Sequence, residues 1–240
     1  MRILHFLREH LANLLFPRAC VGCGAPDTWL CLACTQDIRP ILEQECFVCR
    51  NAKTPHGEAC FACRRKSALD GVFVAAPYRS SALAEAIHVF KYEFVSELAP
   101  VLGSILADAV GHSDLPVPDL IIPVPLHPWR LRYRGFNQSA LLARELAART
   151  LSGLALPTEE TILRRQRFTL PQAKTHSAEE RRYNLSGAFG FTKDFQKRSL
   201  HGKTVWLVDD VLTTGATLEE CARILRKAGT KKVIGVILAR

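Results

Sequence analysis

The stretch from Val205 to Thr217 constrains the fold of this chain more than any other part of it. Its first four residues, Val205–Val208, are all apolar, which is typical of a strand buried on both faces of a parallel sheet. Asp209 and Asp210 end this strand, and a short loop leads from them into a helix predicted over 217–228. The stretch therefore predicts an α/β fold with an open parallel sheet.

The loop after the acid pair has the composition of a phosphate site. Because Gly215 and Ala216 are small, consecutive backbone N–H groups can turn inward as an anion nest, and the helix dipole adds partial positive charge. Hydroxyl donors stand at the same place, on Thr213, Thr214 and Thr217. Asp209 and Asp210 lie one sugar-width away and can accept hydrogen bonds from vicinal hydroxyls, so we predict a ribose 5-phosphate site. The alternative is an acid pair that only caps the helix and a glycine that only turns the chain.

This order of elements resembles the signature of type I phosphoribosyltransferases, which bind phosphoribosyl pyrophosphate (PRPP). The matching residues are the apolar strand, Asp209-Asp210, three further residues, and then Thr214–Thr217. The resemblance implies substitution at C1 of the ribose, with pyrophosphate leaving on Mg²⁺. It also implies that Asp209 and Asp210 are the catalytic pair that orients the 2- and 3-hydroxyls, while residues 213–217 hold the 5-phosphate.

Three arginines follow a second apolar strand, which is predicted over 120–124; they are Arg130, Arg132 and Arg134. Ligands of an open α/β sheet bind at the carboxyl ends of its strands, so this loop should face the same cleft as the acid pair. Because guanidinium groups bind phosphate oxygens bidentately, we predict that the loop holds pyrophosphate or another substrate anion. The alternative is a solvated run of charge.

Asn137 is predicted to cap a helix over 138–150.

Eight of the nine cysteines form four Cys-x-x-Cys pairs, namely Cys20/Cys23, Cys31/Cys34, Cys46/Cys49 and Cys60/Cys63. Each pair can direct two thiolates at one metal ion, and two pairs complete a tetrahedral S₄ shell for zinc. The simplest arrangement gives one ion to the first two pairs and one to the last two, although the spacing leaves crossed pairing open. No secretory signal precedes them, so disulfides are the weaker interpretation.

The remaining chain predicts how these parts are organised. Residues 1–16 have helical apolar spacing, which predicts an amphipathic helix that docks on the protein itself or, alternatively, on a membrane surface. Residues 17–66 should form a double zinc ribbon and residues 67–240 the phosphoribosyltransferase-like domain. No stretch is long and apolar enough to span a bilayer, and we expect a cytoplasmic protein. The net charge of +9 favours anionic partners.

Within the larger domain, the sequence predicts a strand over 72–76 and helices over 81–92 and 94–110. A basic, polar excursion covers 162–185, with a short helix predicted over 177–185. It is either a mobile lid over the site or an ordinary surface hairpin.

Taken together, these features resemble the ComF family of competence proteins. The resemblance is carried by the four cysteine pairs, Phe90-Lys91-Tyr92, the segments 123–128 and 134–138, Gln172 with Arg181 to Asn184, and the segment 208–217. It implies a type I phosphoribosyltransferase fold, a role in DNA uptake and natural transformation, and PRPP, single-stranded DNA and other DNA-uptake proteins as partners. The protein is then either a transferase of unknown acceptor or a non-catalytic adaptor that binds PRPP and single-stranded DNA. Glu93 departs from the pattern, because a glycine-like turn is expected there.

Overall fold

The computed structural model describes residues 18–150, 156–167, 187–193, 195 and 200–240. The helices predicted over 1–16 and 177–185 lie outside these ranges. The core of the fold is a four-stranded parallel sheet with the order β1-β6-β5-β2. Its strands are β1 (Gly71–Ala76), β2 (Leu120–Pro123), β5 (Thr204–Val211) and β6 (Lys232–Ala239). The predicted open parallel sheet is therefore confirmed.

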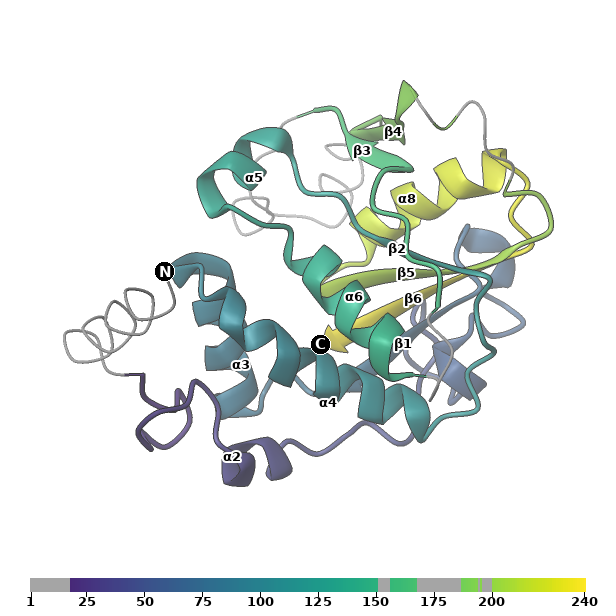
Figure 1. Ribbon diagram of the computed structural model, residues 1–240. Helices are drawn as coiled ribbons and strands as arrows, with labels where there is room; N and C mark the ends of the chain where they lie inside the picture. The colour runs from purple at the N-terminus through teal and green to yellow at the C-terminus, as the bar shows by residue number, and fades with distance from the viewer. Residues whose placement is uncertain (1–17, 151–155, 168–186, 194, 196–199) are drawn as a thin grey trace.

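Helices cover both faces of the sheet (Figure 1). One face packs against α3 (Ser81–His88), α4 (Ala99–Gly111) and α6 (Gln138–Arg149), and the other packs against α8 (Ala216–Lys227). Successive residues of a strand point to opposite faces, so Trp206 joins the first cluster of buried residues and Leu207 the second. Burial on both faces explains why β5 is a continuous apolar run before its acid pair.

Both outer strands of the sheet have a covered edge. The Gln44 side chain lies along β1, where its amide nitrogen donates to the carbonyl of Val74 at 3.0 Å and its amide oxygen accepts from the Val74 N–H at 3.1 Å. Along β2, the N–H of Ile121 donates to the carbonyl of Pro157 at 2.8 Å. Because a free edge exposes unpaired backbone groups, these contacts protect the sheet and tie the cysteine-rich segment to it.

The connection between β1 and β2 departs from the two predicted helices. Helix α3 ends at His88 and continues as a π-helical turn, η3 (Val89–Glu93), and a 3₁₀ turn, η4 (Ser96–Leu98), precedes α4. A glycine-like turn is expected at Glu93, and the residue with a left-handed backbone is instead the next one, Phe94, with φ of 64°. A bulky residue rarely adopts this conformation, and π-turns occur frequently at functional sites.

Two short pieces complete the described chain. Strands β3 (Leu163–Arg165) and β4 (Phe189–Phe191) form an antiparallel pair beside α8, within the polar excursion. The cysteine-rich segment contains α2 (Leu32–Gln36) and the 3₁₀ turns η1 (Pro55–Gly57) and η2 (Arg64–Lys66). The domain boundary near residues 66 and 67 stays a prediction. Among the described residues, no helix is long and apolar enough to cross a bilayer.

Candidate functional site

A cleft of about 510 Å³ opens at the carboxyl ends of β2 and β5. Three groups of residues line it: the acid pair Asp209 and Asp210, part of the loop before α8, and basic side chains from separate elements. The sequence predicted this meeting place from the rule that ligands of an open α/β sheet bind where its strands end.

The acid pair is held by hydrogen bonds and by an ion pair. The Ser139 hydroxyl donates to Oδ1 of Asp209 at 2.8 Å, and the backbone N–H of Asp210 donates to the same oxygen at 3.0 Å. Lys91 Nζ lies 2.8 Å from Oδ1 of Asp210. Burial and the neighbouring Asp210 charge raise the pKa of Asp209 to about 7, against the opposing effects of Lys91 and Ser139. Two adjacent carboxylates in a partly dry cleft therefore depend on nearby donors and cations to stay charged.

The loop after the acid pair ends at Gly215, whose φ of 74° is left-handed, and α8 begins at the next residue. Thr213, Gly215 and Thr217 line the cleft. The other two predicted phosphate residues are oriented differently: Ala216 is buried, and the Thr214 hydroxyl accepts from the Ala216 N–H at 3.5 Å. Because a helix N-terminus presents backbone N–H groups and partial positive charge, this end of the cleft suits an anion.

The prediction that the three arginines lie on a loop is wrong, because they lie on a short helix, α5 (Pro128–Arg134). Pro128 occupies the first turn, where its missing N–H costs nothing, and the ring of His127 accepts from the N–H of Trp129 at 3.2 Å. Helical spacing places Arg130 and Arg134 four residues apart on one side, and both line the cleft. Arg132 does not line it.

A further arginine reaches the cleft from the β3–β4 pair. Arg165 lines the cleft, and burial together with the charge of Arg130 lowers the pKa of its guanidinium. Burial likewise lowers the pKa of Arg134, although the carboxylate of Asp210 opposes this effect. Buried guanidinium groups stay charged, so positive charge from α5 and β3 gathers in the same cleft as the acid pair.

Sequence reasoning missed Lys91, Gln138, Ser139 and Arg165 as residues of the cleft. A signal existed in the sequence for Ser139, a polar residue at the helical spacing of the apolar Leu142 and Leu146. In the structure Gln138 and Ser139 are only 2% and 4% exposed. Asn137 is the N-cap residue of α6 as predicted, but its side chain makes no capping hydrogen bond. Its amide instead donates to the carbonyl of Val124 at 3.0 Å, which fixes the start of α6 to the end of β2.

The cysteine pairs gather into two groups of four, Cys20/Cys23/Cys31/Cys34 and Cys46/Cys49/Cys60/Cys63. Within each group all sulfurs lie within 4.8 Å of one another, and the Cys23–Cys31 and Cys49–Cys60 sulfurs are 3.6 and 3.9 Å apart. Four ligands of a tetrahedral zinc ion, each about 2.3 Å from the metal, are separated by about 3.8 Å. Both groups therefore fit structural zinc.

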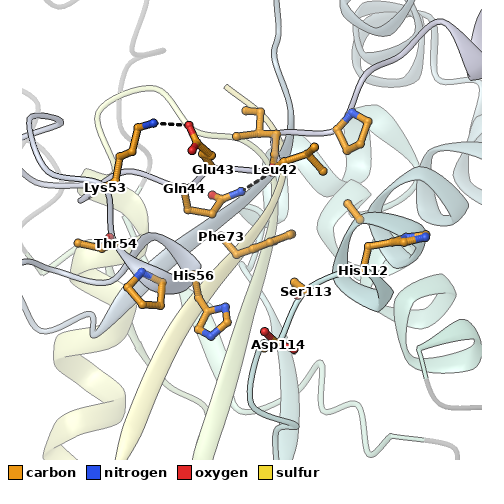
Figure 2. Close-up of a pocket in the computed structure, with 14 residues that line it drawn as sticks. Leu42, Glu43, Gln44, Lys53, Thr54, His56, Phe73, His112, Ser113 and Asp114 are labelled. Carbon is orange, nitrogen blue, oxygen red and sulfur yellow. Dashed lines mark hydrogen bonds and ion pairs between the residues drawn. The ribbon is translucent and has the colours of Figure 1, made fainter.

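A second cavity, of about 490 Å³, lies between residues 40–56 and the end of α4 (Figure 2). Several of its polar groups form hydrogen bonds or ion pairs with other groups of the protein. Gln44 is bonded to β1, Glu43 pairs with Lys53 at the rim, and the Ser113 hydroxyl donates to the carbonyl of Val110. The chemistry predicted from the sequence therefore belongs to the first cleft.

Two known domain families match parts of this chain. Residues 11–64 match the double zinc ribbon domain, and residues 137–240 match the phosphoribosyl transferase domain. The first match contains both cysteine groups, and the second contains the acid pair with its loop. Lys91 and the whole of α5 lie between the two matched ranges.

Curated relatives share these features. "DNA utilization protein YhgH" of Salmonella typhi is 31% identical over 92% of this chain and 96% of its own length. "Competence protein F" of Haemophilus influenzae is 38% identical, but the match spans 57% of this chain and 56% of that protein. "Competence protein ComFC" of Bacillus subtilis is 26% identical over 85% of this chain and 80% of its own length. With both domains and a relative matched almost from end to end, the chain belongs to the ComF family of phosphoribosyltransferase-like proteins with a double zinc ribbon.

Proposed function

We propose that the cleft binds PRPP and that the protein acts in DNA uptake. Residues of the 213–217 loop hold the 5-phosphate, Asp209 and Asp210 accept hydrogen bonds from the ribose hydroxyls, and the arginines of the cleft neutralise the pyrophosphate. The observation that carries the proposal is the meeting of acid pair, helix N-terminus and arginines in one cleft of about 510 Å³. PRPP has two separate anionic ends joined by a sugar with vicinal hydroxyls, and this arrangement complements both.

An unsatisfied donor gives independent support for a ligand in the cleft. Gln138 lines the cleft, is 2% exposed, and its amide nitrogen has no hydrogen-bond partner within the described part of the chain. Leaving a buried amide without a partner costs about 1–3 kcal/mol. A polar ligand would satisfy it, and a sugar oxygen is a suitable acceptor.

Carboxylate oxygens are the ligands that Mg²⁺ prefers, so the acid pair fits a magnesium ion that arrives with PRPP. When bound, the ion would supply further neutralisation of the pyrophosphate charge. The residues of the chain contribute by positioning the ligand and stabilising its charge. The 213–217 loop holds the 5-phosphate, and the cations of the cleft hold the pyrophosphate. In a transfer reaction the acceptor would attack C1 of the ribose, the bond from C1 to the pyrophosphate oxygen would break, and pyrophosphate would leave.

Two of the relatives are called competence proteins and one a DNA utilization protein, which supports a role in DNA uptake. A second candidate function is therefore a non-catalytic adaptor that binds PRPP and single-stranded DNA in the cytoplasm. The rings of Trp129 and Tyr133 on α5 favour it, because they are 56% and 68% exposed and stack with an interplanar angle of 2°. Exposed aromatic rings next to arginines are typical of surfaces that bind single strands.

The PRPP proposal is tested by calorimetric titration of the zinc-loaded protein with PRPP and Mg²⁺. We expect binding by the wild type and none by the double variant Asp209→Asn/Asp210→Asn. The exposed Glu85→Gln on α3 is a matched control that should bind like the wild type. Undiminished binding by the double variant would refute the site.

Release of pyrophosphate with a panel of nucleobases would distinguish a transferase from an adaptor. Oligonucleotide binding at several salt concentrations is the corresponding measurement for the adaptor, because contacts to the nucleic-acid backbone weaken steeply with salt.

A further inference from the structure

Lys91 lies on the π-turn η3 and reaches the acid pair from outside both matched domains. Its Nζ is 2.8 Å from Oδ1 of Asp210, and the two side chains are only 20% and 10% exposed. A π-turn inserts an extra residue into a helix and re-aims the side chains that follow. The turn ends at Phe94 in the left-handed conformation, so local strain accompanies the placement of this lysine.

A second cation approaches Asp210 from another element. The charge of Asp210 acts to raise the pKa of Arg134 on α5. The guanidinium of Arg134 also lies 5.7 Å from the centre of the Tyr92 ring. Lys91 and Tyr92 are neighbours on η3, so η3 and α5 meet around the acid pair. The contact continues outward, where the rings of Phe94 and Tyr133 meet edge to face with centroids 5.3 Å apart.

The chemical structure of PRPP indicates which part of it the cations near the acid pair could bind. In PRPP the pyrophosphate is attached to C1, next to the carbon that carries the 2-hydroxyl. If the acid pair accepts from the 2- and 3-hydroxyls, the pyrophosphate lies within reach of cations that flank the acid pair. Lys91 and Arg134 are such cations, and they come from different elements.

We propose that Lys91 is a pyrophosphate-binding residue that exchanges partners when the ligand enters the cleft. In the empty cleft its ammonium group pairs with Asp210. In the complex it turns to a pyrophosphate oxygen, and Asp210 becomes available as an acceptor for a ribose hydroxyl. This inference rests on the proposed function, because it names a further contact of the same ligand.

Physical reasons make such an exchange feasible. A buried ion pair loses much of its Coulomb energy to desolvation, so its net contribution to stability is small and a competing anion can replace one partner. An ammonium group that left Asp210 without finding another anion would remain buried and unpaired, at a large cost. Pyrophosphate provides that anion. The exchange therefore links occupation of the pyrophosphate end to release of the sugar-binding carboxylate.

The test separates the two ends of the ligand. The zinc-loaded full chain is titrated at pH 8.5, above the raised pKa of Asp209, with PRPP, inorganic pyrophosphate and ribose 5-phosphate. We expect Lys91→Met to weaken PRPP and pyrophosphate binding about tenfold or more, because a charge-assisted hydrogen bond is lost. Ribose 5-phosphate should bind with unchanged or greater affinity, since Asp210 is no longer occupied by the lysine.

Two variants complete the design. Lys91→Arg keeps the charge and should retain most of the pyrophosphate affinity. Arg132→Met removes a cation from α5 that does not line the cleft, and it should leave all three affinities unchanged. Zinc content and unfolding temperature establish that each variant is folded.

Two results would overturn the inference while leaving the proposed function in place. In the first, Lys91→Met binds PRPP like the wild type. In the second, it loses ribose 5-phosphate affinity by the same factor as PRPP affinity, which would mean that Lys91 only maintains the acid pair. A wild-type protein that binds none of the three ligands would instead overturn the proposed function, and this inference with it.

Discussion

The Ser139 hydroxyl donates a hydrogen bond to Oδ1 of Asp209 at 2.8 Å, which joins the first turn of α6 to the end of β5. The bond lowers the pKa of Asp209 against the larger, opposing effect of burial. A residue outside the acid pair therefore helps to set the charge of the pair.

Replacing Ser139 with alanine should raise the pKa of Asp209 further, because the ionised carboxylate loses a donor. In the proposed complex an ionised Asp209 accepts hydrogen bonds from the ribose hydroxyls, so PRPP binding should require a higher pH. We expect the acidic midpoint of the PRPP affinity profile to rise by about half to one pH unit, where one unit corresponds to about 1.4 kcal/mol. Ser104→Ala on α4, whose hydroxyl donates to the carbonyl of Val101, is the matched control. A profile identical to that of the wild type would contradict the assigned role of Ser139.

The acid pair should also cost the protein stability at neutral and alkaline pH. The pKa of Asp209 is raised in the folded state, so its stabilising contribution is complete below the ordinary carboxyl pKa and is lost as the pH rises through about 7. Asp209→Asn should therefore raise the free energy of unfolding at pH 8 by about 1 kcal/mol or more, with a smaller gain at pH 5. Urea unfolding at the two pH values measures the difference. An equal gain at both values would attribute the effect to packing instead of charge.

The parts of the site that the sequence revealed are local in the chain. Asp209, Asp210 and the 213–217 loop follow one another directly, so the run of apolar, acidic and small residues specifies strand, acids and turn without knowledge of the rest of the fold. The cysteine pairs are readable for the same reason, since the two-residue spacing itself determines that both thiolates face one ion.

The residues that were missed reach the cleft only through tertiary structure. The position of Lys91 is set by a π-turn, and the spacing of apolar residues does not predict such a turn. Arg165 lies on the β3–β4 strand pair, which is far from the acid pair in the sequence. Helix α5 escaped prediction because none of its seven residues is buried, and an apolar stripe is the main sequence signal of a helix. The sequence placed the N-cap of α6 correctly at Asn137, but not the bond of its side chain, because the carbonyl of Val124 that receives this bond comes from β2, which is brought beside α6 only by the tertiary structure.

Zinc content should report the two cysteine groups separately. Cys46 is fully buried in its group, so Cys46→Ser should reduce the zinc content from two ions to one per chain. Cys221→Ala is the matched control and should retain two ions, because Cys221 is a buried residue of α8 and lies outside both groups. Mass spectrometry under native conditions gives the stoichiometry. Loss of both ions from Cys46→Ser would show that the two groups fold as one unit.

The close approach at Gly22 gives a sharper test of the first group. A β-carbon at this position would lie 2.7 Å from the sulfur of Cys34, which is closer than side-chain carbons approach in proteins. Gly22→Ala should therefore displace a ligand and weaken zinc binding at this group about tenfold or more, as disturbed ligand support typically does. Gly24→Ala, where no atom lies within 4 Å of the added carbon, tests the left-handed turn alone. Competition with a chromogenic chelator measures both, and equal affinities for the two variants would contradict the steric explanation.

The hydrogen bonds of Gln44 should make the cysteine-rich segment part of the sheet's stability. Gln44→Met keeps the length of the side chain but leaves the N–H and the carbonyl of Val74 without their partners on the edge of β1. Unpaired buried backbone groups cost about 1–3 kcal/mol each, so we expect the free energy of unfolding to fall by about 2 kcal/mol or more. Gln36→Met, at an exposed position of α2, should change it by less than about 0.5 kcal/mol. Amide exchange at Val74 should accelerate in the first variant alone. If Gln44→Met were as stable as the wild type and kept this amide protected, another group would be covering the edge, and the segment would be attached to the sheet by the ion pair of Glu58 with Lys232 on β6 instead.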